Sequence, residues 1–334
     1  MNRIVKWESP SNIALVKYWG KHNFQLPNNP SISFTLNNSK SITSVELITK
    51  QTKKVDFYFD NKLNTNFGLR IEKYLKNISL ELPYINDYSF IIKSTNTFPH
   101  STGIASSASA FSALAMCLIN LNSEINNSII SIKEASNLAR LGSGSACRSV
   151  YGGVSIWGET IDIDNSANEY AIPLNNEVNT IFKTFRDDII IVDADKKSVS
   201  SSAGHKLMDT NPYSVERYNQ AFINVKLLYN ALKNGNIGEF IRIVELEALS
   251  LHSMMMISNP SFILMKPDTL NIINKIREFR NDTSIPVCFT LDAGPNVHIL
   301  YPDENKIKVQ KFISSEMNNY RIINDFVGEG PLKL

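Results

Sequence analysis

The segment RLGSGSACRSVYGG, residues 140–153, combines small hydroxyl side chains, glycines and a guanidinium in a pattern suited to anion binding. Glycine and serine weaken helix and strand interiors, so the segment is poor material for a core. Backbone N–H groups there can approach an oxyanion closely, and Ser143 and Ser145 can donate beside Arg148. Arg148 can bind a carboxylate or phosphate through two parallel hydrogen bonds. The alternative is a solvated arginine on a capping turn.

A second segment, STNTFPHSTGIASSASA at 94–110, runs from a proline-led loop into a strongly helical pattern. Free N–H groups at a helix start, the aligned peptide dipoles and the hydroxyls of Ser106 and Ser107 together make a cradle for phosphate. The sequence lacks GxxxxGK[ST], so this is not a Walker-type loop. The alternative is a loop that only caps its helix.

A third segment, SNIALVKYWGKHN, places Lys17 and Lys21 around an aromatic pair. The extended pattern predicts that Lys17 and Trp19 share one face of a strand while Tyr18 takes the other. The lysines could bind an anion, and the alternative is an edge strand whose lysines reach solvent.

A fourth segment, TLDAGPNVHIL, ends an apolar strand with Asp292 directly before Gly294 and Pro295. An acid in that position often caps the turn. It could equally point into a cleft as a base, and a nearby ammonium would then lower its pKa.

Two further patterns carry weaker indications. The hydroxyl-rich stretch KKSVSSSAGHK at 196–206 is either a phosphate contact or an ordinary connection. The histidines show no metal-ligand spacing, so a histidine metal site is not expected. They are His22, His100, His205, His252 and His298.

Composition bounds the class of protein. The 334 residues are 43% hydrophobic and predict two domains or one large mixed unit. A net charge of +2 gives no reason to expect nucleic acid or a membrane surface as partner. Three separated cysteines indicate a reducing compartment, and the apolar run at 111–121 is too short to span a bilayer. We therefore expect a soluble cytoplasmic protein.

The elements that must position these segments are of mixed type. Before residue 100 the β-type runs are RIVKWE, NIALVKYW, SISFTL, SITSVELIT, KVDFYF and YSFIIKST, with one helix at GLRIEKYLKNI. Helices follow from 103 and at SIKEASNLARLG, then strands at GGVSIWG, EYAIPL and DDIIIVDA. Later helices are predicted near 214–234, 236–256 and 268–280, then strands through VCFTLDAGPNVHILYP and a last helix at ENKIKVQKFISSEM. The lack of regular βαβ alternation favours an α+β fold.

The combination of KYWGK, FPxxxGxASSAS, GSGSACRS with YGG, and DAGPN resembles the mevalonate diphosphate decarboxylases, a family of the GHMP kinase superfamily. The motifs come in the family's order from Asn12 to Gly330, with VGEGP matching the closing element. The resemblance implies a two-domain GHMP kinase fold. Residues 1–184 would form a domain like ribosomal protein S5 domain 2, and residues 185–334 a ferredoxin-like domain carrying Asp292.

The implied activity is the ATP- and Mg²⁺-dependent decarboxylation of mevalonate 5-diphosphate to isopentenyl diphosphate, carbon dioxide, ADP and phosphate. Asp292 would face the 3-hydroxyl, Lys17 would be its ammonium neighbour, and Arg148 would hold the substrate carboxylate. Substrate binding is carried over to Tyr18, Trp19, Gly20, Lys21, Ser143, Gly144, Ser145, Ala146, Cys147 and Arg148. ATP binding is carried over to Pro99, Gly103, Ala105, Ser106 and Ser107. The resemblance gives no metal ligand, and relatives are commonly homodimers.

The sequence also departs from the family pattern. An arginine that usually precedes the helix after the early strands is missing, and Arg70 falls too late to align with it, which leaves open a monophosphate or a diphosphate substrate. His100 and Ser101 stand where smaller residues are common. The alternatives are a related kinase that phosphorylates mevalonate or its phosphate and stops, a phosphomevalonate decarboxylase, and a non-catalytic nucleic-acid-binding module. The pair Lys17 and Asp292 favours decarboxylation, and the near-neutral charge disfavours the nucleic-acid module.

Overall fold

The computed structural model describes residues 3–49, 55–99, 104–194 and 201–334. Its larger sheet has the strand order β14-β1-β4-β7-β5-β6, and β8 pairs with β4 and with β9. All neighbours are antiparallel except β5 and β7. The strands are β1 (Arg3–Ala14), β4 (Ser31–Thr49), β5 (Val55–Phe59), β6 (Lys62–Leu63), β7 (Tyr88–Asn96), β8 (Val154–Trp157), β9 (Ala171–Pro173) and β14 (Leu332–Lys333).

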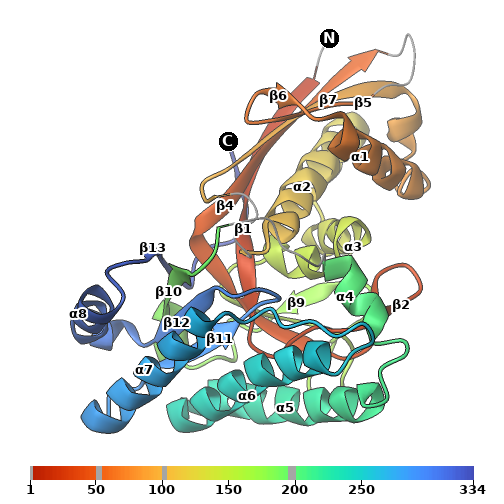
Figure 1. Cartoon of the computed structure of the whole chain (residues 1–334). Coiled ribbons are helices and arrows are strands. Elements are labelled where there is room, and N and C mark those ends of the chain that lie inside the picture. The colour runs from red at the N-terminus through yellow and green to blue at the C-terminus, as the bar shows by residue number, and fades with distance from the viewer. Residues whose placement is uncertain (1–2, 50–54, 100–103, 195–200) are drawn as a thin grey trace.

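Two of these strands are longer than the sequence indicates. RIVKWE and NIALVKYW were predicted as separate strands, but the first and the start of the second merge into β1, and SISFTL and SITSVELIT merge into β4. The register shifts between Pro10 and Asn12, where proline cannot donate to the ladder. The opposite stretch of β4 is held by Asp325, whose carboxylate accepts from three successive backbone N–H groups at 37–39. A polar interruption thus became a bulge within a continuous strand (Figure 1).

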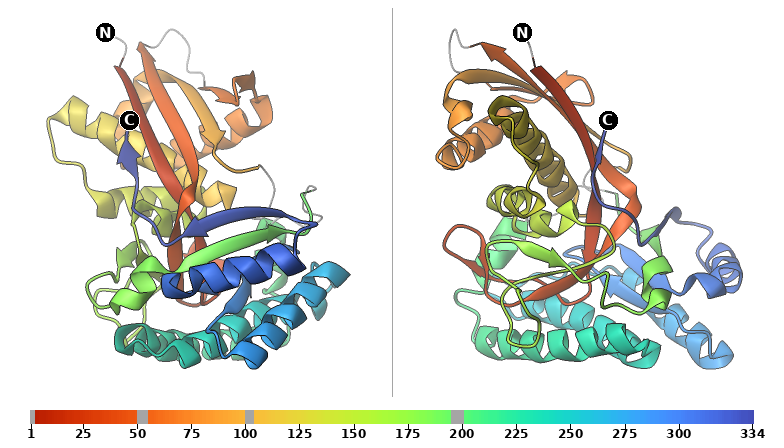
Figure 2. Two further views of the ribbon diagram at one scale, coloured as in Figure 1. Left: turned by 90° about the vertical axis from the view of Figure 1, so that its left-hand side faces the viewer. Right: turned by 180° about the vertical axis from the view of Figure 1, so that it is seen from behind.

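Three helices cover one face of this sheet: α1 (Thr65–Asn77), α2 (Ser106–Asn126) and α3 (Ile132–Gly142) (Figure 2). Side-chain caps begin two of them, since Asn64 accepts from Phe67 and Ser131 accepts from Glu134. Helix α2 is long and apolar enough to cross a membrane, but most of it is buried inside the protein. It packs against β1 and β4 as the central helix of the N-terminal half.

The C-terminal half is built on a four-stranded sheet of order β11-β12-β10-β13. Successive residues of β10 enter different cores: Ile189 packs with the helices α5 and α6, and Ile190 packs with α7 and α8. The elements are β10 (Arg186–Ile191), α4 (Ser201–Leu207), α5 (Ser214–Asn234), α6 (Ile237–Met256), α7 (Pro267–Thr283), β11 (Cys288–Leu291), β12 (Val297–Tyr301), α8 (Lys306–Glu316) and β13 (Arg321–Phe326).

Short elements complete the chain. A two-stranded hairpin joins β2 (Lys21–His22) to β3 (Leu26–Pro27). The 3₁₀ helices are η1 (Pro83–Asn86), η2 (Gly144–Val150), η3 (Thr180–Thr184) and η4 (Asp303–Asn305). The sequence did not predict α4, η2 or β13. The expectation of one strand through Tyr18 and Trp19 was wrong, because β1 ends at Ala14 and the chain turns away in an irregular segment.

The two halves share a buried core and a buried ion pair. Ile13 and Phe34 of the large sheet pack in one cluster with Phe185 and Phe240. Beside this cluster, Glu247 of α6 accepts from Arg217 and Asn224 of α5 and from the backbone N–H of Lys17, at 2.8 Å in the last case. The Arg217 and Glu247 side chains are 1% and 0% exposed. This carboxylate therefore fixes the segment after β1 onto the helices below it (Figure 1).

Arg217→Met should lower the free energy of unfolding by about 3–5 kcal/mol, because it leaves the Glu247 carboxylate buried without its ionic partner. Arg242→Met is the matched control, since Arg242 forms an exposed pair with Glu239 and should change stability by less than about 1 kcal/mol. Urea unfolding of both variants measures the difference. Equal stability of the two variants would contradict this role for the buried pair.

Candidate active site

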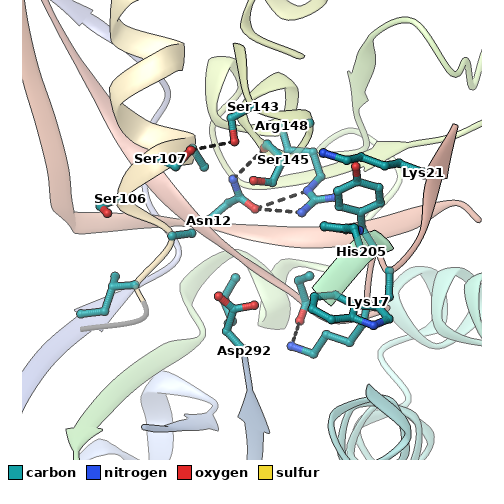
Figure 3. Close-up of a pocket in the computed structure, with 18 of the residues that line it drawn as sticks. Asn12, Lys17, Lys21, Ser106, Ser107, Ser143, Ser145, Arg148, His205 and Asp292 are labelled. Atoms are coloured by element: carbon teal, nitrogen blue, oxygen red, sulfur yellow. Dashed lines mark hydrogen bonds between the residues drawn. The ribbon is translucent and has the colours of Figure 1, made fainter. Parts of the chain in front are cut away.

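A cavity of about 380 Å³ lies where the two halves meet. Figure 3 shows its wall, to which β1, the segment after β1, α2, η2, α4 and the turn after β11 contribute side chains. Residues as far apart in the chain as Asn12 and His298 thus line one cavity. The charged residues of its described lining are Lys17, Lys21, Arg70, Arg148 and Asp292, four cations and one carboxylate. This imbalance favours an anionic ligand.

Arg148 is held at the cavity wall by Asn12. The Asn12 carbonyl oxygen accepts from Nε and Nη2 of Arg148 at 3.3 and 3.2 Å, while its amide group donates to Ser145 and Ser149. The guanidinium lies over the Trp157 ring at 5.8 Å. Nη1 of Arg148 is buried and has no partner within the described chain. An orphan donor at a cavity wall can be satisfied by a ligand carboxylate.

Lys17 and Asp292 lie on the opposite side of the cavity from Arg148 (Figure 3). The Lys17 ammonium group donates to the Ala14 carbonyl at 2.5 Å and is 2% exposed as a residue. Burial lowers the pKa of Lys17 to about 8, although Asp292 and Glu247 oppose that shift. The Asp292 carbonyl faces His252 Nε2 at 3.0 Å, which anchors the turn after β11. The structure places both of these residues, which were predicted to converge, in the lining of one cavity.

The start of α2 forms another wall. Ser106 and Ser107 occupy its first positions after Ala105, whose φ of 37° is left-handed. Ser107 donates to Ser143 at 2.9 Å, which links the helix start to the segment before η2. Free N–H groups and hydroxyls are therefore gathered beside Arg148, an arrangement suited to phosphate oxygens.

The remaining wall carries Tyr18, Lys21, Arg70 and His205. Lys21 donates to Gln25 at 2.7 Å, and its pKa is lowered by burial and by Arg70. The Arg70 guanidinium lies 4.8 Å from the Phe111 ring centroid. The Tyr18 hydroxyl is buried and has no partner within the described chain, and burial raises its pKa. Lys21 and Arg70 thus bring two cations to one end of the cavity.

Most of the residues selected from the sequence line this cavity. They are Lys17, Tyr18, Trp19, Lys21, Ala105, Ser106, Ser107, Ser143, Gly144, Ser145, Arg148 and Asp292. Four others do not: Gly20, Pro99, Ala146 and Cys147. Cys147 is buried with its thiol directed to the Gly144 carbonyl, and Gly20 has a φ of 93°, so it serves the turn. Gly103 lies outside the described residues, as do His100 and Ser101.

Sequence reasoning did not assign Asn12, Arg70, His205 or His298 to the site, and all four line the cavity. Asn12 was quoted as the first residue of a motif, but its side chain was given no role. Arg70 lies on α1 and reaches the cavity past Phe111, which no local pattern reveals. His298 is buried beside Asp187, 2.8 Å from its carboxylate.

The described residues contain no group of three or more histidine, cysteine, aspartate or glutamate side chains that could hold a metal ion. Mg²⁺ usually takes one or two protein oxygens together with substrate phosphates and water. The hydroxyls of Ser106 and Ser107 supply oxygens of that kind at the cavity wall. The donor set therefore fits an ion that arrives with a nucleotide.

Comparison with known proteins matches both halves of the chain to family models. Residues 9–168 match the diphosphomevalonate decarboxylase-like N-terminal domain, and residues 188–331 match the mevalonate 5-diphosphate decarboxylase C-terminal domain. The diphosphomevalonate decarboxylase of Debaryomyces hansenii is 31% identical over 327 residues, which cover 90% of this chain and 80% of that protein. The predicted boundary at 184/185 falls between the two matched ranges and stays a prediction.

Solved structures show the same fold. The mevalonate diphosphate decarboxylase of Staphylococcus aureus has a TM-score of 0.88 at 29% identity, covering 100% of this chain and 98% of that one. A complex of the protein MDDEF with MVAPP, AMPPCP and magnesium has a TM-score of 0.86 at 28% identity, covering 100% and 99%. The predicted two-domain fold of the GHMP kinase superfamily is confirmed. This chain belongs to the diphosphomevalonate decarboxylase family.

Proposed function

We propose that this chain catalyses the ATP-dependent decarboxylation of mevalonate 5-diphosphate to isopentenyl diphosphate, carbon dioxide, ADP and phosphate. The observation that carries the proposal is the cavity lining, in which Lys17 and Asp292 stand across from an orphan guanidinium nitrogen of Arg148. A substrate with a carboxylate, a tertiary hydroxyl and a diphosphate offers one partner to Arg148, one to the pair of Lys17 and Asp292, and one to the cationic end with Lys21 and Arg70. The MDDEF complex with MVAPP, AMPPCP and magnesium supports this choice of ligands.

The phosphoryl step requires positioning and charge neutralisation more than covalent chemistry. Asp292 accepts the proton of the substrate 3-hydroxyl. The 3-oxygen attacks the γ-phosphorus of ATP, and the bond between the γ-phosphorus and the oxygen of the β-phosphate breaks to release ADP. The Lys17 ammonium stabilises negative charge on the transferred phosphoryl group. Mg²⁺, when bound with ATP beside Ser106 and Ser107, neutralises phosphate charge.

The elimination step uses the carboxylate held by Arg148. The bond between C3 and the phosphorylated oxygen breaks, and phosphate leaves with the electron pair. The electrons of the bond from C2 to the carboxylate carbon then form the C2–C3 double bond, and carbon dioxide is released. Arg148 orients the carboxylate, and because it makes only hydrogen bonds, no covalent bond to the enzyme must break. Ser145, whose carbonyl accepts from Asn12, supports the Arg148 wall.

The end of the cavity formed by Tyr18, Lys21 and Arg70 bears on the choice between a monophosphate and a diphosphate. Arg70 could not be aligned from sequence, but it lines the cavity with Lys21, and the Lys21 pKa responds to it. Two cations match the charge of a diphosphate better than that of one phosphate. The predicted homodimer and the cytoplasmic location stay predictions, and sedimentation velocity measures the first.

With ATP and Mg²⁺, purified protein should convert mevalonate 5-diphosphate to isopentenyl diphosphate with one carbon dioxide released per ADP. Mevalonate and its 5-phosphate should be turned over at least about 100-fold less efficiently, because they lack the contacts of the cationic end. A coupled ADP assay with ¹⁴CO₂ trapping measures both products. ADP release without carbon dioxide would support the kinase alternative, and Asp292→Asn serves as the inactive control.

Arg148→Lys should lower kcat/KM by about 10- to 100-fold, because a lysine ammonium cannot reproduce two parallel hydrogen bonds to a carboxylate. Steady-state kinetics with mevalonate 5-diphosphate measures the loss. Arg242→Lys, an exposed position on α6, is the matched control and should keep the wild-type rate. A wild-type kcat/KM for Arg148→Lys would refute the carboxylate-binding role.

The pH profile should report Lys17. Because its pKa is lowered to about 8 by burial, the free enzyme loses this positive charge as pH rises through about 8. We expect kcat/KM to fall over that range in the wild type. In Lys17→Arg the charge persists, so the alkaline fall should disappear even though the overall rate is lower. An unchanged alkaline limb in Lys17→Arg would assign it to another group.

A further inference from the structure

His205 brings helix α4 of the C-terminal half against the aromatic pair after β1. Its ring centroid lies 4.3 Å from that of Tyr18 and 4.7 Å from that of Trp19. The preceding residue is glycine because the approach is close: a Cβ at Gly204 would lie 2.5 Å from the Trp19 ring. His205 is 7% exposed and belongs to the cavity wall. The sequence assigned this stretch no more than an ordinary connection or a phosphate contact.

The hydrogen bond to Gly20 fixes the tautomer of His205. The Gly20 backbone N–H donates to Nδ1 at 2.9 Å, so Nδ1 carries no proton and the ring proton must lie on Nε2. Burial, reinforced by the positive charge of Lys21 and opposed by the Asp292 carboxylate, lowers the pKa of His205 to about 3. The ring is therefore neutral at physiological pH. In the described part of the chain no group accepts a hydrogen bond from Nε2.

The surroundings of His205 are those of an anion site. Lys21 lies close enough to repel a protonated His205, Arg70 lies close enough to depress the Lys21 pKa, and the Tyr18 hydroxyl lacks a partner. A diphosphate has more acceptor oxygens than two cations satisfy. A neutral N–H adds a donor there without adding a third mutually repelling charge.

We propose that His205 binds the substrate diphosphate directly, donating its Nε2–H to a phosphate oxygen while Nδ1 holds the Gly20–Lys21 backbone in place. One ring thus performs two tasks: it contacts the ligand, and it positions the lysine that binds the same group. This inference rests on the proposed function, because it names a further contact for that substrate.

Two substitutions separate the tasks of the ring. In His205→Asn the side-chain oxygen occupies the region of Nδ1, so the acceptor for Gly20 is kept and the cavity donor is lost. In His205→Gln the amide nitrogen reaches the region of Nε2, so the donor is kept. We expect His205→Asn to raise KM for mevalonate 5-diphosphate about 10-fold or more with kcat changed less than about 3-fold. His205→Gln keeps the donor but loses the acceptor for Gly20, so it should raise KM less than His205→Asn does.

Binding of inorganic pyrophosphate, measured by calorimetry, provides a readout that does not depend on turnover. His205→Asn should weaken its Kd about 10-fold, and His22→Asn, an exposed histidine outside the cavity, should leave it unchanged. A wild-type KM and pyrophosphate Kd in His205→Asn would overturn the inference. Equal losses in His205→Asn and His205→Gln, accompanied by a lower melting temperature in both, would also overturn it by showing a packing role only.

These measurements distinguish this inference from the proposed function. If the wild type decarboxylates its substrate and His205→Asn behaves like it, the inference fails and the function stands. If the wild type does not decarboxylate but loses pyrophosphate affinity on His205→Asn, the anion contact stands and the function fails.

Discussion

The site depends on holding several positive charges around one cavity before any ligand neutralises them. Like charges at short range raise the free energy of each other's ionised form, and burial removes the water that would screen them. The protein meets this constraint with fixed acceptors: the Ala14 carbonyl for Lys17, the Asn12 side chain for Arg148 and Gln25 for Lys21. Nη1 of Arg148 and the hydroxyl of Tyr18 are donors that have no hydrogen-bond partner in the described chain. An anionic ligand can accept hydrogen bonds from such donors.

Glu247 holds the backbone of the segment that carries Lys17. The irregular segment after β1 carries three of the site's side chains, yet it has no secondary structure of its own. The backbone N–H of Lys17 donates to the Glu247 carboxylate, which also accepts hydrogen bonds from Arg217 and Asn224. A fully buried carboxylate requires all of its partners, so the segment has little freedom to move. Rigid supporting contacts of this kind give preorganised electrostatic stabilisation its value, since no reorganisation is needed during the reaction.

Burial also shifts the pKa values of the ionisable groups that line the cavity. The same desolvation that leaves His205 neutral lowers the pKa of Lys17 only to about 8, because Asp292 and Glu247 compensate it. Two basic residues that line the same cavity therefore differ in charge at neutral pH, Lys17 as a cation and His205 as a neutral donor. The difference begins with side-chain type, because the ordinary pKa is 10.5 for lysine and 6.5 for histidine, and burial lowers both.

The sequence by itself determined the local features that depend on near neighbours in the chain. Helix α5 was predicted with its observed bounds and α6 to within one residue, because a turn at Gly235 separates two long segments with helical apolar periodicity. The motif carrying Arg148 was found because its glycines and serines stand out from core-forming segments. Lys17 was selected as a lysine beside an aromatic pair, and Asp292 as an acid at the end of an apolar strand. Only the tertiary structure decided what depends on distant partners. Asp325 accepts hydrogen bonds from the backbone where two predicted strands join, and Phe111 packs against the Arg70 guanidinium at the cavity. Gly20 donates to Nδ1 of His205 and so sets the tautomer of that ring. Hydrogen bonds and packing between residues far apart in the chain leave no periodic trace in the sequence, so these placements could not be predicted from it.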